Sequence, residues 1–484
     1  MSTVTDRPNI LWVCTDQQRW DTLGCYGNEF VETPTLDSLA ESGMQFTRAF
    51  AQSPVCSPSR ASFLTGRYPR TTGVRGNGHP IPDRETPVTR SFADAGYTCG
   101  LAGKLHLSPC SPTRPEGSMP ERRIDDGYAE FNWAHGSRYV HLTNEYRRWL
   151  RAEGVEYDPT PVDSSAYVTT SVAPEHSQTM WCADQAVDFI EATAEGDDPW
   201  LFSLNPYDPH HPFDPPAAYL DRYLDRLDDI PLPNYEPGEL TEKPAIQAVC
   251  HEGAYANEEM WPASEMDDDD HRLLRAAYWA MCDLLDDAVE RVLSALERTG
   301  QREDTIVVFT SDHGEQLGDH GIYLKGPFFY EEALRVPLVI SWPDTYVSAE
   351  TDTLVELVDL APTLCEAAGI DPPNRMQGRS LHGALVGEES FEDHRESVYA
   401  EAYDLTHWAS DVRATMVRTD QYKLVRHHGP NRAGELYDLS SDIDETVNHW
   451  NDPAYNDVQT DLLTTLSDRM AETVDPHPER VAPW

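Results

Sequence analysis

The chain has 484 residues, enough for more than one hydrophobic core, and 39% of them are hydrophobic, which excludes a disordered protein. Its 84 acidic and 37 basic residues give a net charge of −47, which argues against nucleic acid or an anionic membrane as a partner. Lysine occurs only four times. So acidic and lysine-poor a surface predicts a halophilic protein, because concentrated counterions screen self-repulsion; an acidic mesophilic protein is the alternative.

Cysteine usage and the N-terminus bear on the compartment. The nine cysteines are odd in number, dispersed, and form no Cys-x-x-Cys pair, which argues against a disulfide framework or a zinc cage. The first eight residues lack a basic region followed by an apolar one, and no apolar run reaches membrane length. We expect a soluble, cytoplasmic protein, unless a leader has been lost.

The first predicted strand covers 9–15, a short apolar run with β-branched and aromatic residues. Asp16 and Gln17 follow at its carboxyl end, where ligand groups gather in open α/β sheets. Their oxygens suit a divalent cation, and an ordinary strand-end turn is the alternative. A helix is expected over 34–43, with a packing role only.

The stretch 53–67, SPVCSPSRASFLTGR, predicts a loop that enters a helix capped by Ser57 or Ser59. Cys56 then lies just before the helix N-terminus, where free N–H groups favour a thiolate or a bound oxyanion. Arg60 lies one turn on and can hold a developing negative charge. A small apolar filler in a plain loop is the alternative for the cysteine.

Two further segments carry candidate anion contacts. Asn77 lies in the glycine-rich loop 73–82 and could donate to a substrate oxygen, although a turn asparagine is the alternative. A strand over 97–102 leads to Lys104 and His106, two apart on a segment expected to continue extended, so that both project to one face. There they could bind an ester and protonate its leaving oxygen.

The middle of the chain alternates strands and helices with two irregular segments. Helices are expected over 181–194 and 271–299, and a strand over 200–204 precedes a proline-stiffened loop with His210. Specificity is expected in the irregular segments 108–180 and 214–265 and in the C-terminal subdomain.

The clearest strand, 305–310, delivers Asp312 and His313, which can both reach one metal ion if the following glycine turns the backbone. Lys325 follows, and we expect a strand over 338–341 and a helix over 354–368.

After residue 369 the pattern changes. Short strands are expected over 398–402, 412–419 and 422–425, followed by a helix over 456–473, which together predict a small α+β subdomain. His407 and Trp408 could reach the site from there. We therefore predict an α/β domain with a mostly parallel central sheet over 1–375 and an α+β subdomain with a small antiparallel sheet over 376–484.

The motifs resemble those of the sulfatase family. Residues 56–67 read Cys-x-Pro-Ser-Arg and then Ala-Ser-x-Leu-Thr-Gly-Arg, and Gly-Lys-x-His follows at 103–106. The resemblance implies an alkaline-phosphatase-like fold and a cysteine converted to formylglycine, whose hydrate attacks sulfur and later expels sulfate by re-forming the aldehyde. It also implies a formylglycine-generating (sulfatase-maturing) enzyme as a partner.

The resemblance further implies roles for single residues. Cys56 would be the nucleophile after modification and a metal contact, supported by Arg60. Lys104, Lys325 and His210 would bind sulfate oxygens, while His106 assists proton transfer and Asn77 contacts substrate. The metal ligands would be Asp16, Gln17, Asp312 and His313; calcium is expected, with manganese or magnesium open because histidine softens the site.

Two rivals stay open beside hydrolysis of a small-molecule or saccharide sulfate ester. A phosphonate or phosphate mono- or diester hydrolase of the same superfamily shares the Asp-Gln, Asn77 and Asp-His features, whereas Lys104 with His106 favours a sulfatase. The other rival is a non-enzymatic anion-binding protein with an unmodified Cys56.

Overall fold

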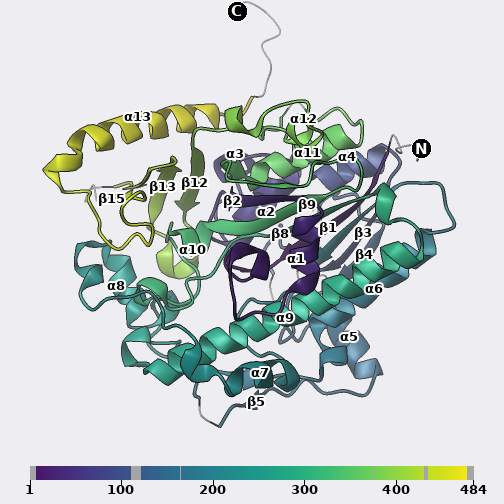
Figure 1. Ribbon diagram of the computed structural model, residues 1–484, viewed down its shortest axis with the longest axis horizontal. Helices are drawn as coiled ribbons and strands as arrows, with labels where there is room; N and C mark the ends of the chain where they lie inside the picture. The colour runs from purple at the N-terminus through teal and green to yellow at the C-terminus, as the bar shows by residue number, and fades with distance from the viewer. Residues whose placement is uncertain (1–6, 111–120, 164, 374, 430–433, 477–484) are drawn as a thin grey trace, which may run out of the picture.

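A large central sheet with helices on both faces organises the protein, and a smaller antiparallel sheet lies at one end (Figure 1). This computed structural model describes residues 7–110, 121–163, 165–373, 375–429 and 434–476.

The central sheet is mostly parallel. Among the strands of the described residues, β9 alone runs against its neighbours, since it pairs antiparallel with both β2 and β8. In spatial order the strands are β10 (Ala349–Thr351), β2 (Met44–Phe50), β9 (Arg335–Ser341), β8 (Thr305–Ser311), β1 (Asn9–Thr15), β7 (Trp200–Asn205), β3 (Thr98–Gly103) and β4 (Glu130–Trp133), with β11 (Val355–Glu356) also paired to β2.

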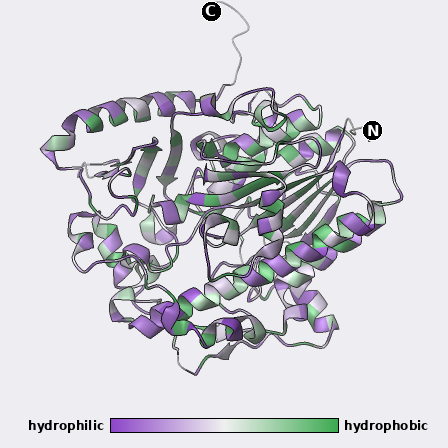
Figure 2. Cartoon of the chain, viewed as in Figure 1, coloured by the Kyte–Doolittle hydropathy of each residue, from purple (hydrophilic) through white to green (hydrophobic). Residues whose placement is uncertain are grey.

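Each face of the sheet has its own hydrophobic core, because successive side chains of a strand point to opposite sides. On β1, Ile10 and Trp12 enter one core, and Leu11 and Val13 enter the other. Figure 2 shows the apolar strands lying between helices of mixed polarity. The first core is covered by α2 (Cys56–Thr65), α4 (Val88–Asp94), α11 (Leu360–Ala367) and α12 (His382–Leu385), the second by α1 (Pro34–Glu41), α6 (Gln178–Thr193), α7 (Ala217–Leu224) and α9 (Asp268–Arg298).

The small sheet is antiparallel throughout, and α13 (Asn456–Glu472) packs on it. Its strands are β12 (Val398–Tyr403), β13 (Arg413–Arg418), β14 (Tyr422–His427) and β15 (Gly434–Asp438). The predicted fold class is thereby confirmed, whereas the division between residues 375 and 376 stays a prediction. The remaining short elements are α3 (Pro69–Thr72), α5 (Glu145–Ala152), α8 (Ala245–His251), α10 (Glu331–Leu334), β5 (Thr160–Pro161) and β6 (Thr169–Thr170).

One predicted element is wrong, and several elements were not predicted, β2 among them. The helix expected over 354–368 is replaced by β11, a 3₁₀ turn and the shorter α11. Val355 pairs with Ala49 of β2, so the apolar run begins as a buried strand. The spacing of apolar residues in a short buried strand does not distinguish it from the start of a buried helix. Strand β2 itself was not predicted, because its MQFTRAF sequence is interrupted by polar residues.

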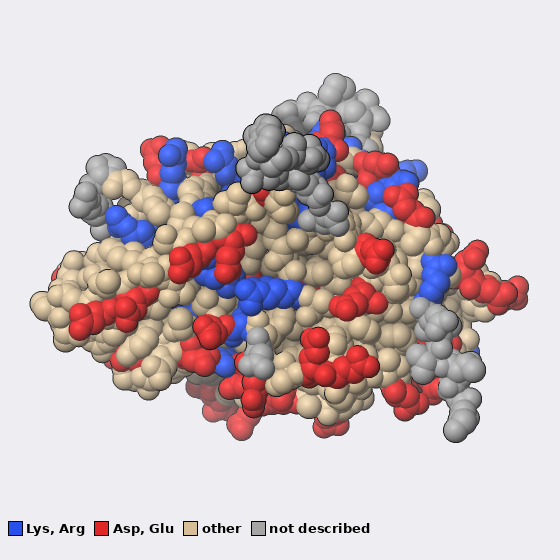
Figure 3. All heavy atoms as spheres, turned by 90° about the horizontal axis from the view of Figure 1, so that it is seen from above, with Lys and Arg blue, Asp and Glu red and all other residues tan. Residues whose placement is uncertain are grey.

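Charge is divided unevenly between surface and interior. Acidic side chains are spread over the face seen in Figure 3, with Lys and Arg in smaller groups between them. All four lysines are buried: Lys104, Lys243, Lys325 and Lys423 are 1%, 7%, 4% and 0% exposed. Among the described residues, none of the helices combines the length and apolarity needed to cross a bilayer.

Candidate active site

Segments far apart in sequence meet at the carboxyl ends of parallel strands. Asp16 follows β1, Lys104 follows β3, and Asp312 follows β8, while His210 lies in the loop after β7. Because these strands are neighbours in the sheet, their ends bring the side chains together, as ligand sites in α/β sheets require.

Cys56 enters the same site from the start of α2. It is the first residue of the helix and buried, and Val55 precedes it as an extended N-cap without a side-chain hydrogen bond. The predicted cap by Ser57 or Ser59 is therefore wrong. Instead, the Asn77 side-chain oxygen accepts a hydrogen bond from the Ser57 N–H at 3.0 Å, which satisfies one free donor of the helix.

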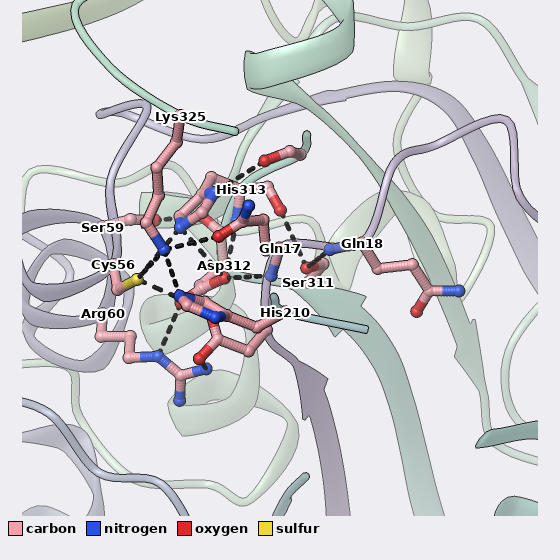
Figure 4. Close-up of polar contacts among 12 residues, drawn as sticks. Gln17, Gln18, Cys56, Ser59, Arg60, His210, Ser311, Asp312, His313 and Lys325 are labelled. Carbon is pink, nitrogen blue, oxygen red and sulfur yellow. Dashed lines mark hydrogen bonds and ion pairs between the residues drawn. The ribbon is translucent and has the colours of Figure 1, made fainter. Parts of the chain in front are cut away.

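Four candidate metal ligands converge around the cysteine sulfur. The ligand atoms of Asp16, Cys56, Asp312 and His313 all lie within 4.8 Å of one another and are buried. The Cys56 Sγ lies 3.1 Å from His313 Nε2 (Figure 4) and 3.5 Å from Asp16 Oδ1. Two carboxylates and an imidazole in one buried cluster fit a divalent cation.

Gln17 adds an amide oxygen to this cluster. Its backbone is left-handed (φ 67°), and its N–H donates to Asp312 Oδ1 at 3.0 Å. Its side-chain amide donates to the buried Glu315 carboxylate, which turns Oε1 toward Lys325 Nζ at 2.6 Å. No role for Glu315 was predicted from the sequence. Its position two residues after His313 is the one feature of the sequence that could have indicated a place in the site.

Cations enclose the cluster (Figure 4). Lys325 Nζ lies 3.0 Å from Cys56 Sγ and 2.6 Å from His210 Nε2, and Lys104 pairs with Asp16. Arg60 donates to Asp312 Oδ2 at 2.7 Å and to the Lys104 carbonyl oxygen at 3.0 Å. The arrangement can hold a tetrahedral oxyanion next to the Cys56 position.

The charges of the protein groups around Cys56 favour a thiolate. Burial and Asp16 raise the pKa of the Cys56 thiol, but Lys104, Lys325 and His313 outweigh them and lower it to about 5. Burial and Lys325 lower the pKa of His210, and burial and Lys104 lower that of His106, so both imidazoles are neutral at neutral pH.

The positions of His106 and His407 differ from those expected from the sequence. The segment after β3 is not extended, because Gly103 (φ 103°) and His106 (φ 57°) are left-handed and turn the chain. His106 packs against His135, which lies in the segment 108–180 expected to carry specificity, with ring centroids 4.8 Å apart. His407 is exposed, whereas the Trp408 ring lies 5.6 Å from Tyr255.

The protein has a layered α/β fold, and carboxylates, imidazoles and lysines cluster at its strand ends around one nucleophile position. These features together define the class of alkaline-phosphatase-like hydrolases. The sulfatase family model matches residues 8–370, and the model of the N-sulphoglucosamine sulphohydrolase C-terminal region matches residues 318–472. The chain therefore belongs to the sulfatase family of sulfuric ester hydrolases, as the motifs predicted.

Individual relatives include sulfatases and a phosphonate monoester hydrolase. The chain is 31% identical over 477 residues to the uncharacterized sulfatase YidJ of Escherichia coli, covering 97% of this chain and 88% of that protein. It is 28% identical to an arylsulfatase of Clostridium perfringens, with 93% and 92% covered. A phosphonate monoester hydrolase from Silicibacter pomeroyi superposes with a TM-score of 0.84 at 26% identity, with 97% and 96% covered.

Proposed function

We propose that the protein hydrolyses a sulfate monoester through a formylglycine formed from Cys56, next to a divalent cation held by Asp16, Gln17, Asp312 and His313. The observation that carries the proposal is the position of Cys56 Sγ, 3.0 Å from Lys325 Nζ and 3.1 Å from His313 Nε2. When present, the formylglycine hydrate supplies an oxygen nucleophile and the cation, with calcium expected, supplies positive charge next to the ester.

The protein's own residues then bind and orient the sulfate. Lys104, Lys325 and His210 offer donors to its oxygens. Arg60 positions Asp312 and approaches Asp16 at 4.0 Å, so one buried guanidinium faces both carboxylates.

Two further residues complete the sulfate contacts. Because the Asn77 carbonyl oxygen is held by the Ser57 N–H, its NH₂ group is left to donate to the substrate. His106, when neutral, carries one N–H that can donate to the leaving oxygen.

The test begins with modification. The protein is coexpressed with a formylglycine-generating enzyme, and mass analysis of the Cys56 peptide measures conversion. Converted protein is expected to hydrolyse an aryl sulfate, and a Cys56→Ala variant is expected to be inactive. Converted protein without sulfatase activity would overturn the proposal.

A phosphonate monoester hydrolase is the second candidate. The similarity to the Silicibacter pomeroyi enzyme and the Asp-Gln and Asp-His pairs favour it, whereas Lys104 and His106 favour a sulfatase. Rates on an aryl sulfate and the matching aryl phosphonate separate the two. Brisk phosphonate cleavage with no sulfate cleavage would establish the second candidate, and no conversion of Cys56 with no turnover would support a non-enzymatic anion-binding protein.

A further inference from the structure

Seven aromatic side chains form a continuous row next to the Cys56 cluster, and we refer to them as the aromatic row. Neighbouring ring centroids along it are 5.6, 5.6, 4.1, 4.4, 6.0 and 4.8 Å apart. In order, the members are Trp408, Tyr255, His211, His210, Tyr207, His135 and His106.

The row is anchored on both sides of the site. Trp408 packs against Gly326, where an added Cβ would lie 2.9 Å from the indole ring, and Gly326 follows Lys325 directly. In the middle of the row, the Lys104 Nζ lies 5.3 Å from the centroid of the Tyr207 ring. A group esterified to a sulfate held by the two lysines would therefore leave the site along these rings.

The rings are not sealed in a core. Tyr207, His211, Tyr255 and Trp408 are all half-buried, so part of each ring is accessible. Tyr255 is held in left-handed backbone geometry (φ 60°, ψ 27°), which is strained for a tyrosine and is found preferentially at ligand-binding positions. Tyr255 and Trp408 come from two of the three regions in which specificity was expected, the 214–265 segment and the C-terminal subdomain.

The row also contains unused polar atoms. The Nδ1 atoms of His106, His135 and His211 are buried and have no hydrogen-bond partner among the described residues. Buried polar atoms are normally paired, so these three point to hydrogen-bonding groups on a ligand. Burial lowers the pKa of all three imidazoles, and a neutral imidazole offers one donor and one acceptor, as hydroxyl groups require.

Within the described part of the chain, positive charge reaches the row from the Cys56 cluster. Lys104 is the one described cation over a tyrosine or tryptophan ring of the row, 5.3 Å from the Tyr207 centroid, and Lys325 lies 2.6 Å from His210 Nε2. Tyr255 and Trp408 have no described cation over their rings, so a second sulfate or a carboxylate on the substrate would find none there, and the net charge of −47 would repel it.

We propose that the aromatic row binds the alcohol half of the substrate and selects an uncharged, hydroxylated ring, that is, a neutral monosaccharide carrying a single sulfate. This inference rests on the proposed sulfatase function. The ring face stacks on Tyr255 and Trp408, and the hydroxyl groups pair with the free imidazole nitrogens.

The test measures kcat and KM of the formylglycine-bearing enzyme on glucose monosulfates and on nitrophenyl sulfate. Tyr255→Ala and Trp408→Ala are expected to raise KM for glucose monosulfates roughly 2- to 13-fold, the equivalent of one lost aromatic contact, with little change in kcat. Trp149→Ala, at a half-buried tryptophan on α5, is the matched control and is expected to leave KM unchanged.

A ring-preserving substitution tests the free nitrogens separately. His135→Phe keeps the ring but removes Nδ1, so KM is expected to rise for glucose monosulfates and stay constant for nitrophenyl sulfate, which has no hydroxyl groups. Unchanged KM values in all three row variants, or a preference for a disulfated or uronate-containing sugar, would overturn the inference while leaving the sulfatase activity in place. Failure of the converted enzyme to cleave any sulfate would instead overturn the proposed function, and the inference with it.

Discussion

Replacing Arg60 by methionine tests how much the buried charges of the site depend on one another. Arg60 is 1% exposed, and its guanidinium donates to Asp312 at 2.7 Å, to the Lys104 carbonyl at 3.0 Å and to the Thr15 carbonyl at 3.4 Å. Methionine retains much of the volume but leaves a buried carboxylate without its cation. Removal of one partner from a buried ion pair costs about 3–5 kcal/mol, and we expect the free energy of unfolding to fall by that amount.

Urea unfolding of the metal-free protein, followed by tryptophan fluorescence, measures the change. Arg298→Met is the matched control, because Arg298 pairs with Glu191 at 2.9 Å with both side chains about half exposed, and such pairs contribute about 0–1 kcal/mol. An Arg60→Met/Asp312→Asn double variant is expected to recover part of the loss, since no unpaired carboxylate remains. A loss below about 1 kcal/mol in Arg60→Met would refute the reasoning, given the cost expected for a buried pair.

Three further predictions concern ions and pH. Chelation of divalent cations is expected to lower the unfolding temperature measured by calorimetry, because an ion at about 100 times its Kd contributes about 2.7 kcal/mol. In the unmodified, metal-free protein, the absorbance of the Cys56 thiolate is expected to increase as the pH rises through about 5. The ordinary pKa of a cysteine thiol is 9.0, so the stability that this thiolate contributes is complete above pH 9.0 and is lost as the pH falls through about 5. Raising KCl from about 0.1 M to about 1 M is expected to raise the unfolding midpoint, because the screening length falls from ~10 to ~3 Å around 84 acidic residues.

Each of these predictions has a contradicting outcome. The cation site would be wrong if chelation left the unfolding temperature unchanged and Asp16→Asn behaved like the wild type. If thiolate absorbance persisted at neutral pH in the Cys56→Ser variant, another cysteine would be its source and the prediction for Cys56 would be wrong. Cys99 is not expected to be that source, because burial raises its pKa to about 12. A midpoint that falls in KCl would argue for the mesophilic alternative.

The sequence was most informative where a strand leads directly into a functional residue. Asp16 and Asp312 were predicted to follow buried strands, and the parallel pairing of β1 with β8 places both at one sheet edge. The local pattern failed where a distant partner decides the structure. Ser57 or Ser59 was expected to cap α2, but the side chain that accepts a hydrogen bond from the Ser57 N–H belongs to Asn77, twenty residues further along the chain.

The aromatic row illustrates a second limit of prediction from the sequence. His135, Tyr207, Tyr255 and Trp408 come from four separate segments, and only their packing against one another reveals the row. Single aromatic residues in loops carry no spacing signal, so the sequence indicated only the regions in which specificity lies. Likewise, His106 was expected on an extended segment, and its left-handed backbone is set by the turn after β3.

The burial of every lysine has a practical consequence for handling this enzyme. Reagents that acylate primary amines would find no lysine on the folded surface, since the most exposed of them is only 7% accessible. Acylation of lysine side chains, as distinct from the α-amino group, would therefore report transient opening of the interior, and acylation of Lys104 or Lys325 would coincide with loss of turnover. Immobilisation through carboxyl groups, which are abundant and outward-facing, would leave the catalytic centre untouched.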